Sequence, residues 1–310
     1  MISCTEFIAS YSELFRYLED KHGRGQVDEF WDYLFKPTGD GIPLINFVLK
    51  EGIRGCYSYW SGTLNEEAAD FTMYLNEKAG WFKIDMHRCP SKGRLLELRN
   101  EIGLEPYRDY CQHCFCYKYS LEKIGLEYIY DFTGTDRAAC SILIFDPKVF
   151  NGKILVDGDT LVMDRKAADN EYFHPDFHSS LNMGVHYLAQ TFGEAELREY
   201  LTLFTERVYG RVIEDIAGRG LAAIADKITD TYAREKASDA VTVALTEDSL
   251  EVTVSYCPAV KHLKRTGRVV SPWFVYTTTV VMERLAEAAG KKFNLNSYDP
   301  ETGAAKYTVE

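Results

Sequence analysis

The sequence predicts an α+β fold made of two tandem repeats, each with helices packed on an antiparallel sheet. The first observation behind this prediction is that landmarks recur in the same order in both halves of the chain. The matched landmarks are Cys89-Pro90 with Cys257-Pro258, and Pro106-Tyr107-x-x-Tyr110 with Pro272-Trp273-x-x-Tyr276. Their offset is nearly constant, at 168 residues for the first pair and 166 for the second. The second observation is that alternating apolar and polar residues precede each Cys-Pro, which is typical of a strand.

Each repeat is expected to contain the same elements in the same order. An opening helix ends in glycine, because Tyr17-Leu18 through Gly23 matches Tyr187-Leu188 through Gly193. A hairpin follows, then a short helix after Cys-Pro, then a helix from Pro106 to Gly125 or from Pro272 to Gly290, and finally two short strands. The expected strands are 71–75, 82–87, 126–132 and 140–145 in the first repeat, and 240–245, 250–256, 291–298 and 305–309 in the second.

Three segments make up the expected domain organisation. Residues 1–145 form the first repeat, residues 174–310 form the second, and residues 146–173 connect them. Within the connection, Asp157-Gly158 predicts a type I′ turn between strands at 153–156 and 160–163. Pro175 suits the first turn of the next helix.

Composition and charge exclude several classes of protein. The chain has 310 residues, with 35 Lys plus Arg against 47 Asp plus Glu, so its net charge is −12. An acidic protein lacks the basic surface that neutralises the phosphates of a nucleic acid. No run approaches the roughly 18 apolar residues of a membrane span, and the first residues do not resemble a secretory signal. We therefore expect a cytoplasmic protein that binds neither nucleic acid nor membrane. Its amphipathic segment 194–216 would suit a solvated face or a homodimer surface.

The cysteines are the most informative residues. Seven of the eight lie before residue 150, and three of them fall with His113 within the six residues from Cys111 to Cys116. On an α-helix, Cys111 and Cys114 would share one face, whereas His113 and Cys116 would point to the opposite side. The second repeat lacks this set, and its residues matching Cys111, His113 and Cys114 are Thr277, Thr279 and Val280. The Cys/His set is therefore expected to serve function rather than packing.

Three interpretations of this set are open. In the first, Cys89 and Cys140 converge with Cys111 and Cys114 on a zinc ion, as four thiolates or as three with an open position. In the second, Cys114 is a catalytic nucleophile with Cys111 and His113 nearby, activated by the positive end of the helix. His113 would point away from Cys114, so His87 or a histidine of the other repeat would be the better base. In the third, the cysteines are buried small side chains without chemistry.

A second group of polar side chains is His174-Pro175-Asp176-Phe177-His178. One interpretation is that His174 and His178 ligate a metal. The other is that His174 caps the helix that starts at Pro175, and that His178 is a polar residue of the core.

Several of these motifs resemble the L-2-amino-thiazoline-4-carboxylic acid hydrolase family of bacterial proteins. They are the Arg88-Cys89-Pro90 strand end, the Cys111-Gln112-His113-Cys114 segment, and the segment from Gly134 to Cys140-Ser-Ile-Leu-Ile. The order of elements is also similar to that of the 4-vinyl-reductase-type small-molecule-binding domain. The resemblance covers most of residues 60–145 and, more weakly, residues 235–310. It implies a pocket bounded by a strand-to-helix cysteine, a helix, and a hairpin with glycine followed by cysteine.

The resemblance implies a small-molecule hydrolase that breaks a C–N or C–S bond in a small heterocycle or amide, assisted by a thiol or a metal. Cys114 would act with Cys111, His113 and Cys89 nearby. The alternative function is a non-catalytic module that binds or senses a small molecule and carries a structural zinc site. A third and simpler interpretation is an interaction scaffold without a ligand.

Overall fold

The computed structural model describes residues 1–35 and 43–310. The chain divides into two compact units. The cysteine-rich unit comprises Leu18–Asn100 and Glu105–His174, and the C-terminal unit comprises Met1–Tyr17, Glu101–Leu104 and Pro175–Glu310. Both combine helices with an antiparallel sheet, so the predicted α+β class is confirmed. No helix of the described residues is long and apolar enough to cross a membrane.

This division differs from the predicted one. Residues 1–17, expected in the first repeat, belong to the C-terminal unit, where Phe7 of α1 (Phe7–His22) stacks on Phe177 with ring centroids 4.7 Å apart. Residues 146–173, expected as a connection, belong to the cysteine-rich unit because one of their segments joins its sheet. Both differences arise from packing between segments that are distant in the sequence, which local patterns do not reveal.

The cysteine-rich unit has a five-stranded sheet in the order β3-β4-β2-β1-β5, and all neighbouring strands are antiparallel. The strands are β1 (Asp70–Asn76), β2 (Trp81–Arg88), β3 (Glu127–Asp131), β4 (Cys140–Phe145) and β5 (Leu161–Arg165). The helices are α2 (Arg24–Phe35), α3 (Pro43–Glu51), α4 (Arg54–Glu66), α5 (Pro90–Ile102) and α6 (Tyr117–Lys123), with short 3-10 helices η2 (Tyr110–Cys116), η3 (Thr135–Arg137) and η4 (Ala167–Asp169). The alternating segments therefore predicted β1 to β4 to within a residue at each end.

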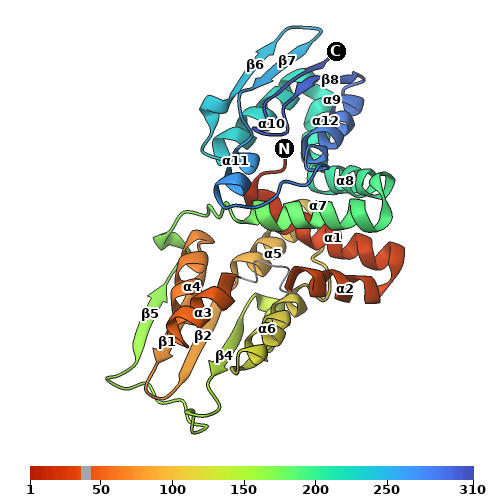
Figure 1. Cartoon of the computed structure of the whole chain (residues 1–310). Coiled ribbons are helices and arrows are strands. Elements are labelled where there is room, and N and C mark those ends of the chain that lie inside the picture. The colour runs from red at the N-terminus through yellow and green to blue at the C-terminus, as the bar shows by residue number, and fades with distance from the viewer. Residues whose placement is uncertain (36–42) are drawn as a thin grey trace. The chain divides into compact units, whose positions relative to one another are not determined.

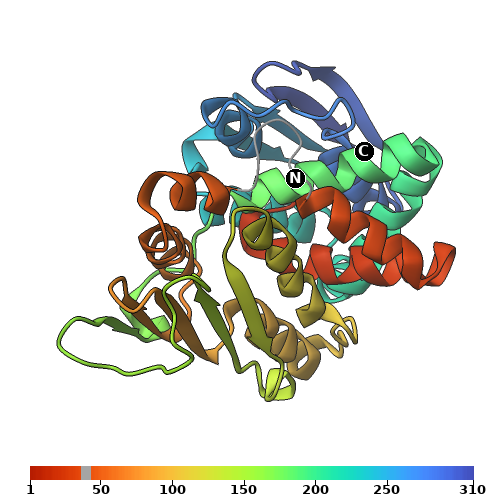
Figure 2. The same cartoon turned by 60° about the horizontal axis from the view of Figure 1, so that its bottom comes forward.

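The predicted hairpin in the connection is wrong in its pairing. The turn forms at Asp157, but residues 153–156 are not a strand, and β5 pairs instead with β1 so that Leu161 lies opposite Leu75. Asn76 Nδ2 stabilises this arrangement by donating to Asp157 Oδ1 and Thr160 Oγ1, each at 3.1 Å. β5 therefore pairs with the free edge of β1. The segment that precedes β5 forms a loop at one end of the sheet (Figures 1 and 2).

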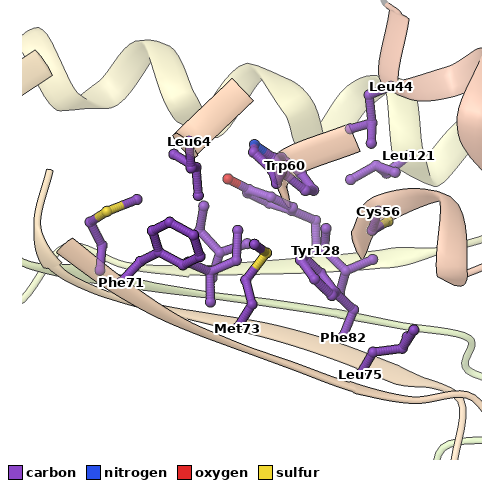
Figure 3. Packing of buried hydrophobic residues seen from close by; sticks show 14 of the residues in the cluster. Leu44, Cys56, Trp60, Leu64, Phe71, Met73, Leu75, Phe82, Leu121 and Tyr128 are labelled. Carbon is purple, nitrogen blue, oxygen red and sulfur yellow. The ribbon is translucent and has the colours of Figure 1, made fainter. Parts of the chain in front are cut away.

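The core of the cysteine-rich unit lies between the sheet and its helices. Figure 1 shows α3 and α4 over β1 and β2. Alternate residues of β1, namely Phe71, Met73 and Leu75, are buried toward these helices, as the two-residue period of a strand requires (Figure 3). Trp60 of α4 stacks on Phe82 of β2 with centroids 5.6 Å apart and an interplanar angle of 7°. The apolar packing holds α4 against the sheet.

The C-terminal unit has a four-stranded antiparallel sheet in the order β6-β7-β9-β8. Its strands are β6 (Val241–Leu245), β7 (Leu250–Val254), β8 (Phe293–Tyr298) and β9 (Ala305–Val309). Its helices are α7 (Phe177–Phe192), α8 (Glu194–Val208), α9 (Gly210–Arg219), α10 (Leu221–Arg234), α11 (Pro258–Arg265) and α12 (Tyr276–Ala288), with the first part of α1 and the short 3-10 helices η1 (Cys4–Glu6) and η5 (Ser238–Ala240).

The two sheets share one strand order when their strands are matched as the repeat predicts. The orders are then β3-β4-β2-β1 and β8-β9-β7-β6, and β5 is the additional strand. The opening helices α1 and α7 each have 16 residues, and each is followed by a glycine with positive φ, Gly23 at 85° and Gly193 at 96°. These correspondences agree with a repeat, although its origin by duplication stays a prediction.

Some predicted helices start or break elsewhere. The segment expected as one helix from Pro106 to Gly125 is α-helical only in α6, because the bonds from Tyr110 N–H to Tyr107 O and from Gln112 N–H to Asp109 O are the i to i+3 bonds of a 3-10 helix. The helix after Pro175 begins at Phe177, and the helix expected from Pro272 begins at Tyr276. The amphipathic segment 194–216 is interrupted at Tyr209, between α8 and α9.

Candidate thiol site

Two cysteines are positioned by the ends of strands in the cysteine-rich unit. Cys89 follows β2 and precedes α5; its backbone N–H donates to Ala138 O at 2.6 Å, and its Sγ accepts from the Lys92 N–H at 3.5 Å. Cys140 opens β4 opposite Met86 of β2 and is hydrogen-bonded by the Tyr130 hydroxyl. The sheet therefore places both thiols at the same end of its two central strands.

Cys114 and His113 form a hydrogen-bonded pair within η2. His113 Nε2 lies 3.5 Å from Cys114 Sγ, and the other ring nitrogen, Nδ1, is hydrogen-bonded to the backbone carbonyl of Tyr110. A neutral imidazole that donates from Nδ1 to a carbonyl keeps Nε2 as an acceptor. The prediction that His113 points away from Cys114 is therefore wrong, because it assumed α-helical geometry.

The pKa values of this pair favour a neutral thiol beside a neutral imidazole. Burial lowers the pKa of His113 to about 4, although the bond to Tyr110 O acts in the opposite direction. Burial also raises the pKa of Cys114 well above its usual value of 9.0, and the neighbouring thiols of Cys89, Cys111 and Cys140 raise it further. Cys114 retains partial exposure. The pair is thus an S–H group next to a base, rather than a preformed thiolate and imidazolium.

A second hydrogen bond fixes the backbone of this segment. The Tyr128 hydroxyl, from β3, donates to the Cys114 carbonyl oxygen at 2.9 Å. Burial and the Cys114 and Cys140 thiols raise the pKa of Tyr128 well above 10.0, so its hydroxyl remains a donor. The nucleophile candidate is consequently attached to the sheet through its own main chain.

Glu67 is a site residue that the sequence analysis did not select. It directly follows α4, and burial raises its pKa to about 7, although His174 and Arg94 lower the value and Glu66 raises it. Its charge contributes in turn to the raised pKa of Cys89 and Cys114. A carboxyl that titrates near neutral pH can donate or accept a proton during a reaction. The sequence signal was a carboxylate three residues before a buried strand.

A pocket of about 1010 Å³ opens next to η2 in the cysteine-rich unit. Its walls include the aromatic side chains of Trp31, Phe115 and Phe132, the cation of Lys92, and the thiol of Cys111. Burial raises the pKa of Cys111 to about 11, against the attraction of Lys92. Charged groups line it as well, namely Arg24 and Arg108 and the carboxylates of Asp28, Glu29, Asp32, Asp109 and Asp136. Cys111 thus lies on the pocket wall, while Cys114 is not among the described lining residues.

The four cysteines proposed as zinc ligands are neighbours, because Cys89, Cys111 and Cys140 each perturb Cys114 electrostatically. They are not assembled as a ligand set, however. Among the described residues, the one group of three or more His, Cys, Asp or Glu side chains whose ligand atoms all lie within 4.8 Å of one another is Cys4, His178 and Glu235. Zinc at Cys89, Cys111, Cys114 and Cys140 therefore stays a prediction.

The histidines proposed as partners have other roles in the structure. His87 Nε2 is hydrogen-bonded to Thr72 Oγ1 at 2.7 Å, and that hydroxyl donates to Asp164 Oδ1 at 2.8 Å. His87 is therefore hydrogen-bonded within the sheet, to a Thr72 hydroxyl that the Asp164 carboxylate of β5 orients. The prediction that His87 serves Cys114 as a base has no support in these contacts.

His174 and His178 also have separate partners. His174 Nδ1 is hydrogen-bonded to Glu66 Oε2 at 2.6 Å in the cysteine-rich unit, so it does not cap α7. His178 lies in the C-terminal unit, where its Nε2 is 2.9 Å from Glu235 Oε2. Metal binding by His174 and His178 as one ligand pair has no support in these contacts.

Comparisons with known proteins add nothing to this geometry. No protein-family model matches the chain, and neither does any curated protein or solved structure.

Proposed function

We propose that the cysteine-rich unit is a thiol hydrolase that breaks a C–N or C–S bond at an electrophilic carbon of a small heterocycle or amide. Cys114 is the nucleophile and His113 is its base. The single observation that carries this proposal is the position of the His113 imidazole, between the Tyr110 carbonyl and the Cys114 thiol. A base oriented by a third group next to a nucleophile is the arrangement that covalent catalysis requires.

The reaction proceeds in two balanced steps. In the first, His113 Nε2 takes the Cys114 proton as Sγ bonds to the carbon, the C–N or C–S bond breaks, and the proton passes to the leaving nitrogen or sulfur. In the second, His113 takes a proton from water, the hydroxyl bonds to the same carbon, and the carbon–Sγ bond breaks as the proton returns to Cys114. The net reaction adds one water molecule to the substrate, and the enzyme is restored.

The remaining groups support this chemistry. Glu67 has a pKa of about 7 and interacts electrostatically with Cys114, so near neutral pH it can protonate a leaving group. Lys92 and Cys111 line the pocket together with two arginines and five carboxylates, so it can hold a substrate that carries both a carboxylate and a basic nitrogen. The pocket volume of about 1010 Å³ accommodates a small molecule with space for water.

A non-catalytic ligand-binding module is the second candidate. The observation that favours it is that the thiol on the pocket wall is Cys111, whereas the pair with an oriented base contains Cys114. In that case a small molecule binds in the pocket and no covalent intermediate forms.

The test is turnover by the full chain on a panel of small cyclic amides, thiazolines and thioesters, with 2-amino-thiazoline-4-carboxylate included because of the family resemblance. Released amine or thiol is measured by mass spectrometry. Cys114→Ala should abolish turnover, and His113→Gln should reduce it by about 10²- to 10⁴-fold. Cys56→Ala, a cysteine buried in the core and distant from η2 in sequence, is the matched control and should retain activity. Full turnover by Cys114→Ala would exclude the mechanism, and binding without turnover in the wild type would favour the second candidate.

A further inference from the structure

Three buried side chains of the C-terminal unit meet although they are far apart in the sequence. Cys4 begins η1, His178 lies in the first turn of α7, and Glu235 follows α10. Their residues are 1%, 1% and 5% exposed. One potential ligand atom from each lies within 4.8 Å of the other two. A thiol, an imidazole and a carboxylate are thus gathered at one position in the interior.

Hydrogen bonds already orient the carboxylate of this group. Glu235 Oε1 accepts from the Ser3 hydroxyl at 2.8 Å and from the Cys4 backbone N–H at 2.6 Å, while Oε2 lies 2.9 Å from His178 Nε2. Because Glu235 binds the main chain of Cys4, it also determines where the Cys4 side chain begins. The three donors are thus pre-positioned by the fold.

The imidazole of His178 has an unsatisfied atom. Its Nδ1 is buried and has no hydrogen-bond partner among the described residues. The other ring nitrogen, Nε2, faces Glu235. The ligand atom of His178 in this group is therefore Nε2, which can bind an ion when the ring carries its proton on Nδ1.

We propose that Cys4, His178 and Glu235 bind one zinc ion. Zinc takes thiolate, imidazole and carboxylate ligands at about 2.0–2.3 Å in a tetrahedron, in which donor atoms are roughly 3.5 Å apart. The observed spacing, within 4.8 Å, requires only a small side-chain adjustment to reach that value. A thiolate ligand excludes Mg²⁺ and Ca²⁺, which prefer oxygen. Binding replaces the Cys4 S–H bond by a zinc–sulfur bond and releases one proton to solvent.

The burial of the ligands gives this site a structural role, in which the three side chains take three positions of the tetrahedron and a water molecule takes the fourth. Three residues separated by more than 50 positions would be joined at one ion, which ties η1 to the start of α7 and to the end of α10. The site is independent of the thiol pair in the cysteine-rich unit, because it shares no residue with it. Its presence or absence therefore leaves the proposed hydrolase mechanism unaffected.

The experiment measures zinc bound to the full chain by elemental analysis, after incubation with Zn²⁺ and removal of the excess. We expect one zinc per chain in the wild type, and a loss of nearly all of it in Cys4→Ser and in His178→Gln. The double variant Cys111→Ser/Cys114→Ser is the matched control and should retain it. Absence of stoichiometric zinc in the wild type overturns the proposal, and so does zinc that is lost in the control but kept in Cys4→Ser.

A second measurement covers the case in which those variants do not fold. The wild type is loaded with Co²⁺, whose thiolate-to-metal charge-transfer absorption grows with the number of bound sulfurs. One thiolate per cobalt, together with the intense visible bands of a tetrahedral ion, supports the site. Two or more thiolates per cobalt place the metal at the cysteine cluster instead and overturn the proposal.

Discussion

His113 Nε2 lies 3.5 Å from Cys114 Sγ although the two residues are adjacent in the chain. The bond from His113 Nδ1 to the Tyr110 carbonyl turns the ring toward its neighbour. Nucleophile and base therefore belong to one short 3-10 helix, so their separation depends on local backbone geometry and not on the docking of distant segments. Catalysis by this pair would tolerate changes elsewhere in the fold that preserve η2.

The resting protonation state of the pair can be measured by alkylation. Because burial raises the pKa of Cys114 well above 9.0 and lowers that of His113 to about 4, iodoacetamide should modify Cys114 slowly at neutral pH. The rate should keep rising beyond pH 9, as followed by mass spectrometry of the Cys114 peptide. Cys111, with a pKa of about 11 and a place on the pocket wall, should react first. A plateau in the Cys114 rate below about pH 8 would reveal a preformed thiolate and contradict this expectation.

Substitution of Glu67 should stabilise the protein above neutral pH. Burial raises its pKa from 4.5 to about 7 on folding, so the folded state holds the proton more tightly and stability declines as the pH rises through this window. Glu67→Gln removes the decline, and at pH 8 the variant should be more stable by up to about 3 kcal/mol. The two proteins should converge below about pH 4.5 in thermal unfolding. Glu127→Gln, at an exposed position in β3, is the control and should show no such crossover.

Two glycines of α4 should respond to alanine in opposite directions. A Cβ at Gly55 would overlap the backbone carbonyl of Phe47 in α3, whereas a Cβ at Gly62 meets nothing within 4 Å. Gly55→Ala should lower the free energy of unfolding by about 1–3 kcal/mol through overpacking. Gly62→Ala should raise it by about 0.5–1 kcal/mol, because alanine favours a helix. Urea titration of both variants measures the difference, and a shift of equal sign in both would refute the close packing of α3 on α4.

Glu6 should stabilise the C-terminal unit in a pH-dependent way. Its carboxylate accepts from Lys227 Nζ at 2.5 Å and from the Tyr209 hydroxyl at 2.8 Å. Burial alone would raise its pKa, but Lys227 and the hydrogen bonds outweigh burial and lower it from 4.5. A lowered pKa means that the stabilisation is present above pH 4.5 and is lost as the pH falls through the folded-state value.

Glu6→Gln should therefore destabilise the protein by about 1–3 kcal/mol near pH 7, since it leaves a half-buried lysine without its charged partner. The difference from the wild type should vanish in acid. Glu206→Gln is the control, because its ion pair with Arg284 is partly exposed and should contribute less than about 1 kcal/mol. Thermal unfolding from pH 7 to pH 3 measures both, and a deficit in Glu6→Gln that persists at pH 3 would contradict the assignment.

Local patterns in the sequence predicted most of the sheets. Alternation and Cys-Pro boundaries located β1 to β4 and β6 to β9, since the side-chain period of a strand can be read within a few residues. The sequence predicted a strand near 160–163, where β5 lies, but paired it with residues 153–156 instead of β1. Which edge of the sheet is free to pair depends on how the whole sheet assembles. Pairing between distant segments carries no local signal.

The candidate site could be predicted less completely. The sequence predicted Cys111, His113 and Cys114 as a functional set. It predicted the wrong direction for the His113 side chain, because it assumed the 100° rotation per residue of an α-helix. The segment is instead the 3-10 helix η2, in which the His113 imidazole is hydrogen-bonded to the Tyr110 carbonyl. The sequence did not predict Glu67 as a site residue, because its raised pKa results from burial by segments that are distant in the sequence. Charges and protonation states are products of tertiary packing, and only residue types and spacings are available beforehand.

The C-terminal unit takes Met1–Tyr17 from the beginning of the chain and Pro175–Glu310 from its end. During translation, the ribosome delivers the segments of the cysteine-rich unit before α7 has been made. The ring of Phe7, which packs on Tyr11 within α1, can stack on Phe177 only after Phe177 has been synthesised. We therefore expect the cysteine-rich unit to fold first during synthesis, and the opening helix to pack against α7 only afterwards.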